Sequence, residues 1–443
     1  MTSGNLPRVN VVGLGKLGAP LAAVLASRGF DVIGLDVNKV LVDAMNAGKM
    51  PIIEPQLNEL IAANRPRLKA SMDANEAIQN SDASFVIVPT PSGSDGFFSN
   101  RFVIQAMETL GKALRTKKGY HVVVITSTVM PGSTGTVIKE ALEAASGRKV
   151  GPDLGLCYNP EFIALGSVVR DMLYPDSILV GEGDKKAGDV LAGIYLQMCE
   201  KKPPVQRMNW ISAELTKISV NTYVTTKISY ANMLADICDR LPGADVDVVT
   251  KALGADTRIG AKYLKGAMGY GGPCFPRDNV AFAALARKIG ARADVAEATD
   301  RINNHQVDRL SDLVAKFAKA GTKIALIGLS YKPHTPVVEE SHSVKLAARL
   351  ADAGYVVTVH DPLAQDAGLT ALGEKVIGAS SLEQAVRDCD LLIVGTGWPE
   401  YKDIDPAWTK RSGQKLTILD LWRTLPADKF GDVADVIYLG QGR

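Results

Sequence analysis

The sequence has no long hydrophobic run, so nothing in it resembles a membrane-spanning segment. Its apolar runs, such as Val122–Ile125, have the length of a β-strand, whereas a spanning helix needs about 18 apolar residues. The segment Met1–Pro7 is polar and precedes a strand that glycine interrupts, which is not typical of a signal peptide. We therefore expect a protein with no membrane partner and no export signal.

An excess of charge of one sign is also missing. The chain holds 50 Lys and Arg residues against 48 Asp and Glu residues, for a net charge of +2. This balance provides no broad positive field for nucleic acid, although a local basic pocket remains possible within it. We expect no nucleic-acid partner.

Cysteine and histidine are scarce and scattered. The five histidines show no metal-type spacing, and the cysteines show no CxxC spacing. This pattern argues against a disulfide framework and against a zinc site. It predicts a cytoplasmic, metal-free protein. The cysteines are Cys157, Cys199, Cys238, Cys274 and Cys389.

The length of 443 residues is too great for a single hydrophobic core. Strand and helix patterns alternate in the first part of the chain and again after about residue 305, and residues 212–241 contain neither Pro nor Gly. We expect an α/β protein in which a long helix of a helical middle domain joins two Rossmann-like, doubly wound domains. The predicted domains are residues 1–205, 206–305 and 306–443.

A glycine turn follows the apolar run Val9–Val12 and precedes a helical pattern. In it, Gly13 permits a tight turn, Gly15 lets a pyrophosphate approach the backbone, and Gly18 allows close helix–strand packing. Asp36 follows the second strand, where a carboxylate accepts ribose hydroxyls and repels a 2′-phosphate. The pattern predicts NAD rather than NADP as the cofactor; the alternative is a glycine turn beside a solvated aspartate.

Glycine is concentrated a second time in Tyr270–Asp278, which contains Cys274 just before a helical pattern. A cysteine near a helix N-terminus gains thiolate character and can act as a nucleophile. Asp278 lies four residues further on, close to the start of the helix. The alternative for Cys274 is a small buried thiol, which we expect for the other four cysteines.

Four more polar residues lie at positions suited to catalysis. Lys217 and Asn221 share one face of the long helix and could stabilise an oxyanion or hold water, but a solvated helix face fits the same spacing. Thr128 follows a strand, at the sheet edge where α/β proteins bind ligands. Glu161 also follows a strand, and either a general base or a helix cap would fit its position.

Together these residues resemble the UDP-glucose/GDP-mannose dehydrogenase family over nearly the whole chain, and the motifs occur in the family's order. The motifs are Gly13–Gly18, Val88–Pro91, Ser127–Val129, Asn159–Phe162, Glu214–Lys217 with Asn221, Arg258–Gly260, Gly271–Asp278 and Gly328–Lys332.

The resemblance implies an NAD-dependent enzyme that oxidises the 6-hydroxyl of a nucleotide sugar to a carboxylate in two steps. It also implies a homodimer formed through the middle domain, with the third domain binding the nucleotide sugar. UDP-glucose is the expected substrate, with a UDP-N-acetylhexosamine or GDP-mannose as alternatives. A single-step β-hydroxyacid-type dehydrogenase, which shares the Rossmann domain and the Lys-x-x-x-Asn pair, is a further alternative that Cys274 and the third domain distinguish.

The resemblance also assigns roles to individual residues. Cys274 matches the nucleophile that forms a thiohemiacetal and then a thioester. The catalytic positions correspond to Cys274, Lys217, Asn221, Asp278, Glu161 and Thr128. The cofactor positions correspond to Gly13, Gly15, Lys16, Leu17, Gly18, Asp36, Thr90 and Thr128. The substrate positions correspond to Glu161, Phe162, Lys217, Asn221, Arg258, Lys265, Gly271, Lys332 and Arg423.

The chain departs from the family pattern at several positions. Leu165 stands where many members carry a second glutamate. The segment Val337–Ser341 lacks an arginine that is usual there, and Asp420–Arg423 replaces a shorter Asp-x-Arg motif. Pro273 precedes the nucleophile where acetylhexosamine dehydrogenases have histidine, which favours a neutral hexose as the substrate.

Overall fold

The structure is a computed structural model that describes residues 6–443. The segment Met1–Pro7, in which we expect no export signal, therefore lies mostly outside the described residues. The chain divides into two compact units, unit 1 (Met1–Ser219) and unit 2 (Val220–Arg443). Within residues 6–443, none of the helices combines the length and the apolar character that crossing a bilayer requires.

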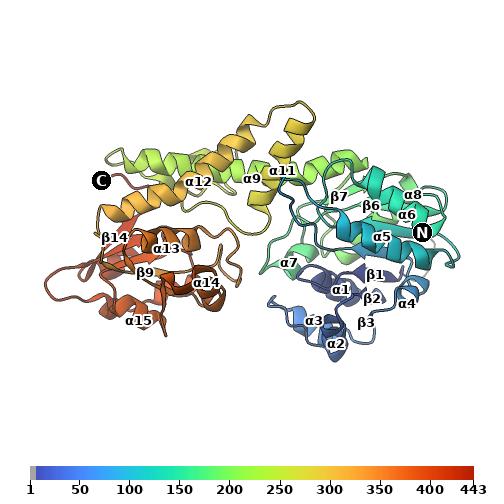
Figure 1. The fold of residues 1–443 in the computed structure, drawn as a ribbon, viewed down its shortest axis with the longest axis horizontal. Helices are drawn as coiled ribbons and strands as arrows, with labels where there is room; N and C mark the ends of the chain where they lie inside the picture. The colour runs from blue at the N-terminus through green and yellow to red at the C-terminus, as the bar shows by residue number, and fades with distance from the viewer. Residues whose placement is uncertain (1–5) are drawn as a thin grey trace. The chain divides into compact units, whose positions relative to one another are not determined.

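Unit 1 is built on an eight-stranded sheet with the order β3-β2-β1-β4-β5-β6-β7-β8 (Figure 1). The first six strands of this order are parallel, as the alternation of strands and helices predicts. The exception is β7, which pairs antiparallel with β6 and parallel with β8. Antiparallel neighbours need no crossover connection, and such strands are common near the edge of a parallel sheet. The strands are β1 (Val9–Val12), β2 (Val32–Leu35), β3 (Leu68–Ser71), β4 (Ala83–Val86), β5 (His121–Ile125), β6 (Leu154–Tyr158), β7 (Ile178–Glu182) and β8 (Val205–Met208).

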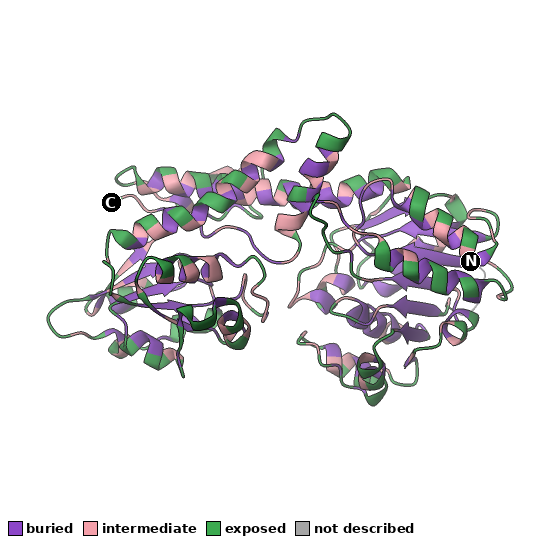
Figure 2. Cartoon of the chain, in the orientation of Figure 1, coloured by how far each residue is buried: buried purple, intermediate pink, exposed green. Residues whose placement is uncertain are grey.

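Helices cover both faces of this sheet, so its central strands are buried throughout, as the purple strands in Figure 2 show. Residues of α1, α3, α7 and α8 form the core on one face, and residues of α4, α5 and α6 form it on the other. Burial on both faces explains why these strands are continuous apolar runs. The helices are α1 (Gly18–Ser27), α2 (Lys39–Ala47), α3 (Leu57–Ala63), α4 (Ala74–Gln79), α5 (Arg101–Leu114), the π-helix η1 (Thr134–Ile138), α6 (Lys139–Ser146), α7 (Val168–Leu173) and α8 (Lys185–Met198).

Unit 2 contains a second sheet, with six parallel strands in the order β11-β10-β9-β12-β13-β14. Numbered along the chain, this order repeats that of the first six strands of unit 1, with the reversal between the first and fourth strands that defines a Rossmann-like sheet. The prediction of two doubly wound domains is confirmed. The strands are β9 (Lys323–Ile327), β10 (Val356–His360), β11 (Ile377–Gly378), β12 (Leu391–Val394), β13 (Leu416–Asp420) and β14 (Ala434–Tyr438).

The predicted long helix is α9 (Trp210–Asp239), which begins in unit 1 and ends in unit 2. Its 30 residues run without the Pro and Gly that would interrupt it. The helical segment continues with α10 (Val246–Ala255), α11 (Phe275–Lys288) and α12 (Asp294–Ala315). The remaining helices of unit 2 are α13 (His342–Asp352), α14 (Gln365–Leu372), α15 (Leu382–Arg387), α16 (Ala427–Phe430) and the 3₁₀-helices η2 (Gly373–Lys375), η3 (Pro399–Asp403) and η4 (Pro406–Thr409).

Candidate active site

The glycine turn between β1 and α1 has the geometry that its spacing predicts. Gly13 has a φ of +92°, and a Cβ there would lie 2.2 Å from the Ile87 carbonyl oxygen. A Cβ on Gly18 would lie 1.7 Å from the Gly13 carbonyl oxygen. A Cβ on Gly15 would meet no atom within 4 Å, so the turn leaves open space at the position where the sequence predicts a pyrophosphate.

Asp36, at the end of β2, is tied to the same turn. Its carboxylate accepts a hydrogen bond from the Leu14 amide at 2.6 Å and one from the Asn38 amide at 2.8 Å. These bonds fix the carboxylate beside the turn, in the position from which it would meet a ribose. The acidic residue predicted to act with the glycine turn therefore contacts that turn directly, through the Leu14 amide.

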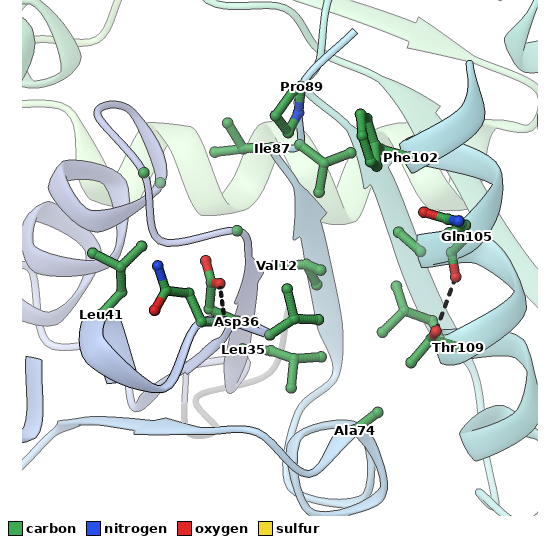
Figure 3. Close-up of a pocket in the computed structure, with 18 of the residues that line it drawn as sticks. Val12, Leu35, Asp36, Leu41, Ala74, Ile87, Pro89, Phe102, Gln105 and Thr109 are labelled. Atoms are coloured by element: carbon green, nitrogen blue, oxygen red, sulfur yellow. Dashed lines mark hydrogen bonds between the residues drawn. The ribbon is translucent and has the colours of Figure 1, made fainter. Parts of the chain in front are cut away.

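A cavity of about 710 Å³ opens beside this turn. In Figure 3, Asp36 and Leu41 lie on one side of it and Phe102 lies with Gln105 on the other. Its lining is largely apolar, as an adenine and a nicotinamide would require. The glycines, the aspartate and the apolar walls thus fit a dinucleotide. The predicted cofactor residues among its lining are Gly13, Gly15, Lys16, Leu17, Gly18 and Asp36.

Two further predicted residues, Thr90 and Thr128, lie together on the loops that follow β4 and β5. The Thr90 hydroxyl donates to the Thr128 carbonyl oxygen at 2.8 Å. Beside them, the Ser127 hydroxyl accepts from the Val88 amide at 2.9 Å and donates to the Val88 carbonyl oxygen at 2.7 Å. These bonds join the two loops at the carboxyl edge of the sheet, next to the switch point between β1 and β4.

Glu161 and Phe162 meet Lys217 in unit 1. The Lys217 ammonium donates to the Glu161 carbonyl oxygen at 2.7 Å and lies 4.8 Å from the centre of the Phe162 ring. The Glu161 carboxyl accepts a 2.7 Å hydrogen bond from Tyr195, a buried residue of α8. Burial raises the pKa of this carboxyl, against the lowering effects of the Tyr195 hydrogen bond and the Lys217 charge. Glu161 is thus held as a partly buried acid rather than as a helix cap.

Cys274 precedes α11 in unit 2 as its N-cap residue and is exposed, whereas the other four cysteines are buried. The thiol thus lies at a helix N-terminus, as the sequence predicts, where backbone N–H groups favour a thiolate. Its reactivity stays a prediction. Asp278 lies in the first turn of α11, and its carboxylate accepts a 2.6 Å hydrogen bond from the Asn221 side-chain amide. Both groups are buried, with exposed fractions of 2% for Asp278 and 8% for Asn221.

The glycine loop before Cys274 packs on the segment that follows β9. A Cβ on Gly271 would lie 2.4 Å from the Glu340 carbonyl oxygen, and one on Gly272 would lie 2.6 Å from the Tyr331 ring. Burial, followed by the charge of the neighbouring Cys274, raises the pKa of Tyr331. The Lys332 ammonium lies 5.9 Å from the centre of the Tyr331 ring. Unit 2 thus brings Gly271 and Cys274 close to the Tyr331–Lys332 segment.

Three further predicted substrate residues belong to unit 2. The Arg258 side chain is exposed and pairs with Asp256 at 2.6 Å, and Lys265 is exposed. Arg423 is largely buried and pairs with Asp245 at 2.7 Å. A role of these three residues in substrate binding stays a prediction.

Sequence reasoning missed that the second Rossmann-like sheet has its own aspartate, Asp361, after β10. Its carboxylate accepts from the Leu329 and Ser330 amides at 2.7 and 3.0 Å and from the Trp398 indole at 3.2 Å. Asp361 holds its turn as Asp36 holds the turn of unit 1, but it is 2% exposed and covered by Trp398. The signal was available, because Asp361 follows β10 as Asp36 follows β2.

The fold and the glycine turn define an oxidoreductase that uses NAD. The chain belongs to the UDP-glucose/GDP-mannose dehydrogenase family. The family's NAD binding domain matches residues 7–199, its central domain residues 211–305 and its UDP binding domain residues 325–427.

Individual relatives agree with this assignment. The chain is 36% identical to UDP-glucose 6-dehydrogenase AglM of Haloferax volcanii, over 90% of this chain and 93% of the relative. It is 32% identical to GDP-mannose 6-dehydrogenase of Pseudomonas savastanoi pv. phaseolicola, over 88% of this chain and 90% of the relative. A solved UDP-glucose dehydrogenase from Pyrobaculum islandicum superposes with a TM-score of 0.90 at 31% identity, covering 100% of this chain and 99% of that one.

Proposed function

We propose that the enzyme oxidises UDP-glucose to UDP-glucuronate in two steps, through a thiohemiacetal and a thioester on Cys274. The single observation that carries this proposal is the exposed thiol at the N-terminus of α11, with the buried Asp278–Asn221 pair one turn further on. A dehydrogenase that stops after one step has no need of a nucleophile. Covalent capture, by contrast, retains the aldehyde for a second oxidation.

The residues that would hold NAD are Gly13, Gly15, Gly18 and Asp36, on the support of the turn geometry and the adjoining cavity. When bound, NAD supplies the hydride acceptor for each oxidation. Asp36 would accept the ribose hydroxyls, and the amides at the N-terminus of α1 would face the pyrophosphate.

The polar residues of the site would stabilise the oxyanion, form the covalent adduct and position the attacking water. We assign Lys217 and Asn221 to the oxyanion that develops when an alkoxide or a tetrahedral adduct forms at C6 of the sugar. Cys274 adds to the aldehyde, oxidation of this adduct gives the thioester, and attack by water releases the carboxylate and the thiol. Glu161 and Asp278, with Thr128, would hold that water and take its proton. No metal enters this scheme.

The choice of UDP-glucose rests on similarity and on residue chemistry. One relative named for UDP-glucose, AglM, is 36% identical to this chain, whereas the GDP-mannose relative described above is 32% identical. We place the sugar nucleotide against Phe162, Gly271 and Arg423. We assign its diphosphate to Lys265, Lys332 and Arg258, with Arg258 reaching the site of the partner subunit in a dimer.

A homodimer formed through the helical segment is part of this proposal. Its support is an apolar stripe on α9, where Tyr223, Tyr230 and Ile237 lie seven residues apart and are 66%, 47% and 46% exposed. Side chains spaced seven apart share one face of a helix, and a second copy would cover them. The proposed dimerisation domain is 206–305, between an NAD domain 1–205 and a nucleotide-sugar domain 306–443. The thiol of Cys274 requires a reducing compartment, which supports a cytoplasmic location.

The deciding experiment measures NADH released per sugar consumed, with a panel of UDP-glucose, UDP-N-acetylhexosamines and GDP-mannose. We expect two NADH per UDP-glucose and UDP-glucuronate as the product. A yield of one NADH would contradict the thioester mechanism and favour a single-step dehydrogenase. Two NADH from GDP-mannose, with none from UDP-glucose, would retain the mechanism and change the substrate.

A further inference from the structure

The loop 159–168 connects β6 with α7 and carries two of the predicted site residues, Glu161 and Phe162. Its first residue is anchored in the sheet. The Asn159 amide donates to the Ile125 carbonyl oxygen at 2.9 Å, and its side-chain amide donates to the Leu179 carbonyl oxygen at 2.7 Å. The beginning of the loop is therefore held by main-chain groups of β5 and β7.

The end of the loop is held by Glu54, a partly buried residue of the connection between α2 and α3. One carboxylate oxygen accepts a hydrogen bond from the Gly166 amide at 2.8 Å, and the other accepts from the Val168 amide at 2.7 Å. Hydrogen bonds to an ionised acceptor are stronger than bonds between neutral groups. The Glu54 carboxylate thus accepts hydrogen bonds from two main-chain amides of a segment that lies more than 100 residues further along the chain.

Apolar contacts hold the same two segments. Ile52, two residues before Glu54, packs against the core on one face of the unit 1 sheet. Ile163 and Leu165 of the loop pack against the same core. Leu165 therefore supplies an apolar anchor where many family members have a carboxylate. The acidic groups Glu54 and Asp171 both contact this part of the loop: Glu54 through the Gly166 and Val168 amides, and Asp171 through the Ser167 hydroxyl at 2.7 Å.

Between its two anchors the loop touches Lys217. The ammonium contacts the Glu161 carbonyl oxygen and the Phe162 ring, at 2.7 and 4.8 Å. Since both contacts come from residues between the two anchors, the position of the ammonium depends on the path of the loop. Asn159 holds one end of that path, and Glu54, together with the Asp171 contact to Ser167, holds the other.

We propose that Glu54 is a positioning residue of the active site. By binding the Gly166 and Val168 amides, it fixes the loop that presents Glu161 and Phe162 to the Lys217 ammonium. Its effect on turnover rests on the proposed function, because only there does Lys217 stabilise an oxyanion. A small displacement of a catalytic group lowers the rate of the chemical step by a large factor. Loss of the Glu54 contacts therefore lowers this rate without weakening the binding of NAD.

The first test is amide hydrogen exchange in Glu54→Gln, with Glu59→Gln as the matched control on the exposed first turn of α3. We expect exchange of the Gly166 and Val168 amides to accelerate about tenfold or more in Glu54→Gln, with peptides of β6 unchanged in both variants. Unchanged protection of the two amides in Glu54→Gln would overturn the proposal. This measurement needs no substrate, so it stands even if no nucleotide sugar is oxidised and the proposed function fails.

The second test is kinetic. We expect Glu54→Gln to lower kcat about tenfold while the KM for NAD changes less than about twofold. A kcat in Glu54→Gln equal to that of Glu59→Gln would overturn the proposal. If Glu54→Gln does not fold, Glu54→Asp, which keeps the charge and shortens its reach, is judged by the same criteria.

Discussion

The Asn221 side-chain amide donates a 2.6 Å hydrogen bond to the Asp278 carboxylate in the buried interior of unit 2. The bond joins α9 to the first turn of α11, the helix that Cys274 precedes. A contact at this position supports the helix start that carries the thiol as well as the chemistry proposed there.

Removal of the Asp278 carboxylate is therefore expected to lower both the stability of unit 2 and the activity of the enzyme. In Asp278→Ala the Asn221 amide loses this acceptor, and loss of a buried acceptor costs about 1–3 kcal/mol. We expect the free energy of unfolding of unit 2 to fall by that amount in urea titration, and NADH release to fall roughly a hundredfold. The double variant Asn221→Ala/Asp278→Ala is the control. If the loss of stability in this double variant equals the sum of the losses in Asn221→Ala and Asp278→Ala, the hydrogen bond does not couple the two helices.

The thiol of Cys274 is expected to be essential for acid formation and dispensable for NAD. Cys274→Ala should lower the rate of uronic acid formation roughly a thousandfold or more, because the aldehyde adduct no longer forms. NAD affinity, measured by titration calorimetry, should stay within about twofold of wild type. Cys238→Ala, which changes a buried thiol of the same unit, should remain active. Full acid production by Cys274→Ala would rule out the thioester.

The features predicted from the sequence are those with a local signal. The glycine turn and Asp36 follow from spacing alone, and the long helix follows from the absence of Pro and Gly. The contacts of Glu54 with Gly166 and of Tyr195 with Glu161 join segments far apart in the chain. No periodicity records such contacts, because they depend on which helices and loops meet at the sheet edge. The antiparallel direction of β7 was missed for the same reason.

Asp36 is expected to set both the affinity for the cofactor and the choice between NAD and NADP. Asp36→Ala removes the acceptor of the Leu14 and Asn38 amides together with the predicted ribose contact. We expect the Kd for NAD to rise at least about tenfold, which corresponds to about 1.4 kcal/mol, and discrimination against NADP to weaken. Asp43→Asn, on the exposed surface of α2, is the control and should bind NAD normally. An unchanged Kd in Asp36→Ala would remove this residue from the ribose site.

Arg423 is expected to stabilise unit 2 through its partner at the start of α10. Its guanidinium lowers the pKa of Asp245 even though burial acts in the opposite direction. It also donates to the Leu439 carbonyl oxygen at 3.1 Å. Arg423→Ala should lower the free energy of unfolding by about 1–3 kcal/mol, since the partly buried carboxylate loses its cation. Asp245→Ala separates the two roles of the arginine: a higher KM for UDP-glucose in Arg423→Ala alone would support the nucleotide contact, and equal KM values would contradict it.

The buried His121 is expected to make unit 1 sensitive to mild acid. It is the single histidine of residues 1–219 and is fully buried on β5, where Ser84 lies 2.9 Å from its ring. Burial lowers its pKa to about 3. The ordinary value is about 6.5. Between these values the folded unit leaves the ring neutral, whereas the unfolded chain binds a proton.

Stability from this histidine is therefore fully present above pH 6.5 and is lost progressively as the pH falls toward 3. From pH 7.5 to pH 5 the loss should reach about 2 kcal/mol in the free energy of unfolding of unit 1. Urea titrations of wild type and His121→Gln at both pH values isolate the contribution, because the amide does not titrate but can still contact Ser84. The variant should lose about 2 kcal/mol less than wild type over this interval. Parallel pH dependence in the two proteins would show that the imidazole is protonated in the folded unit as readily as in the unfolded chain.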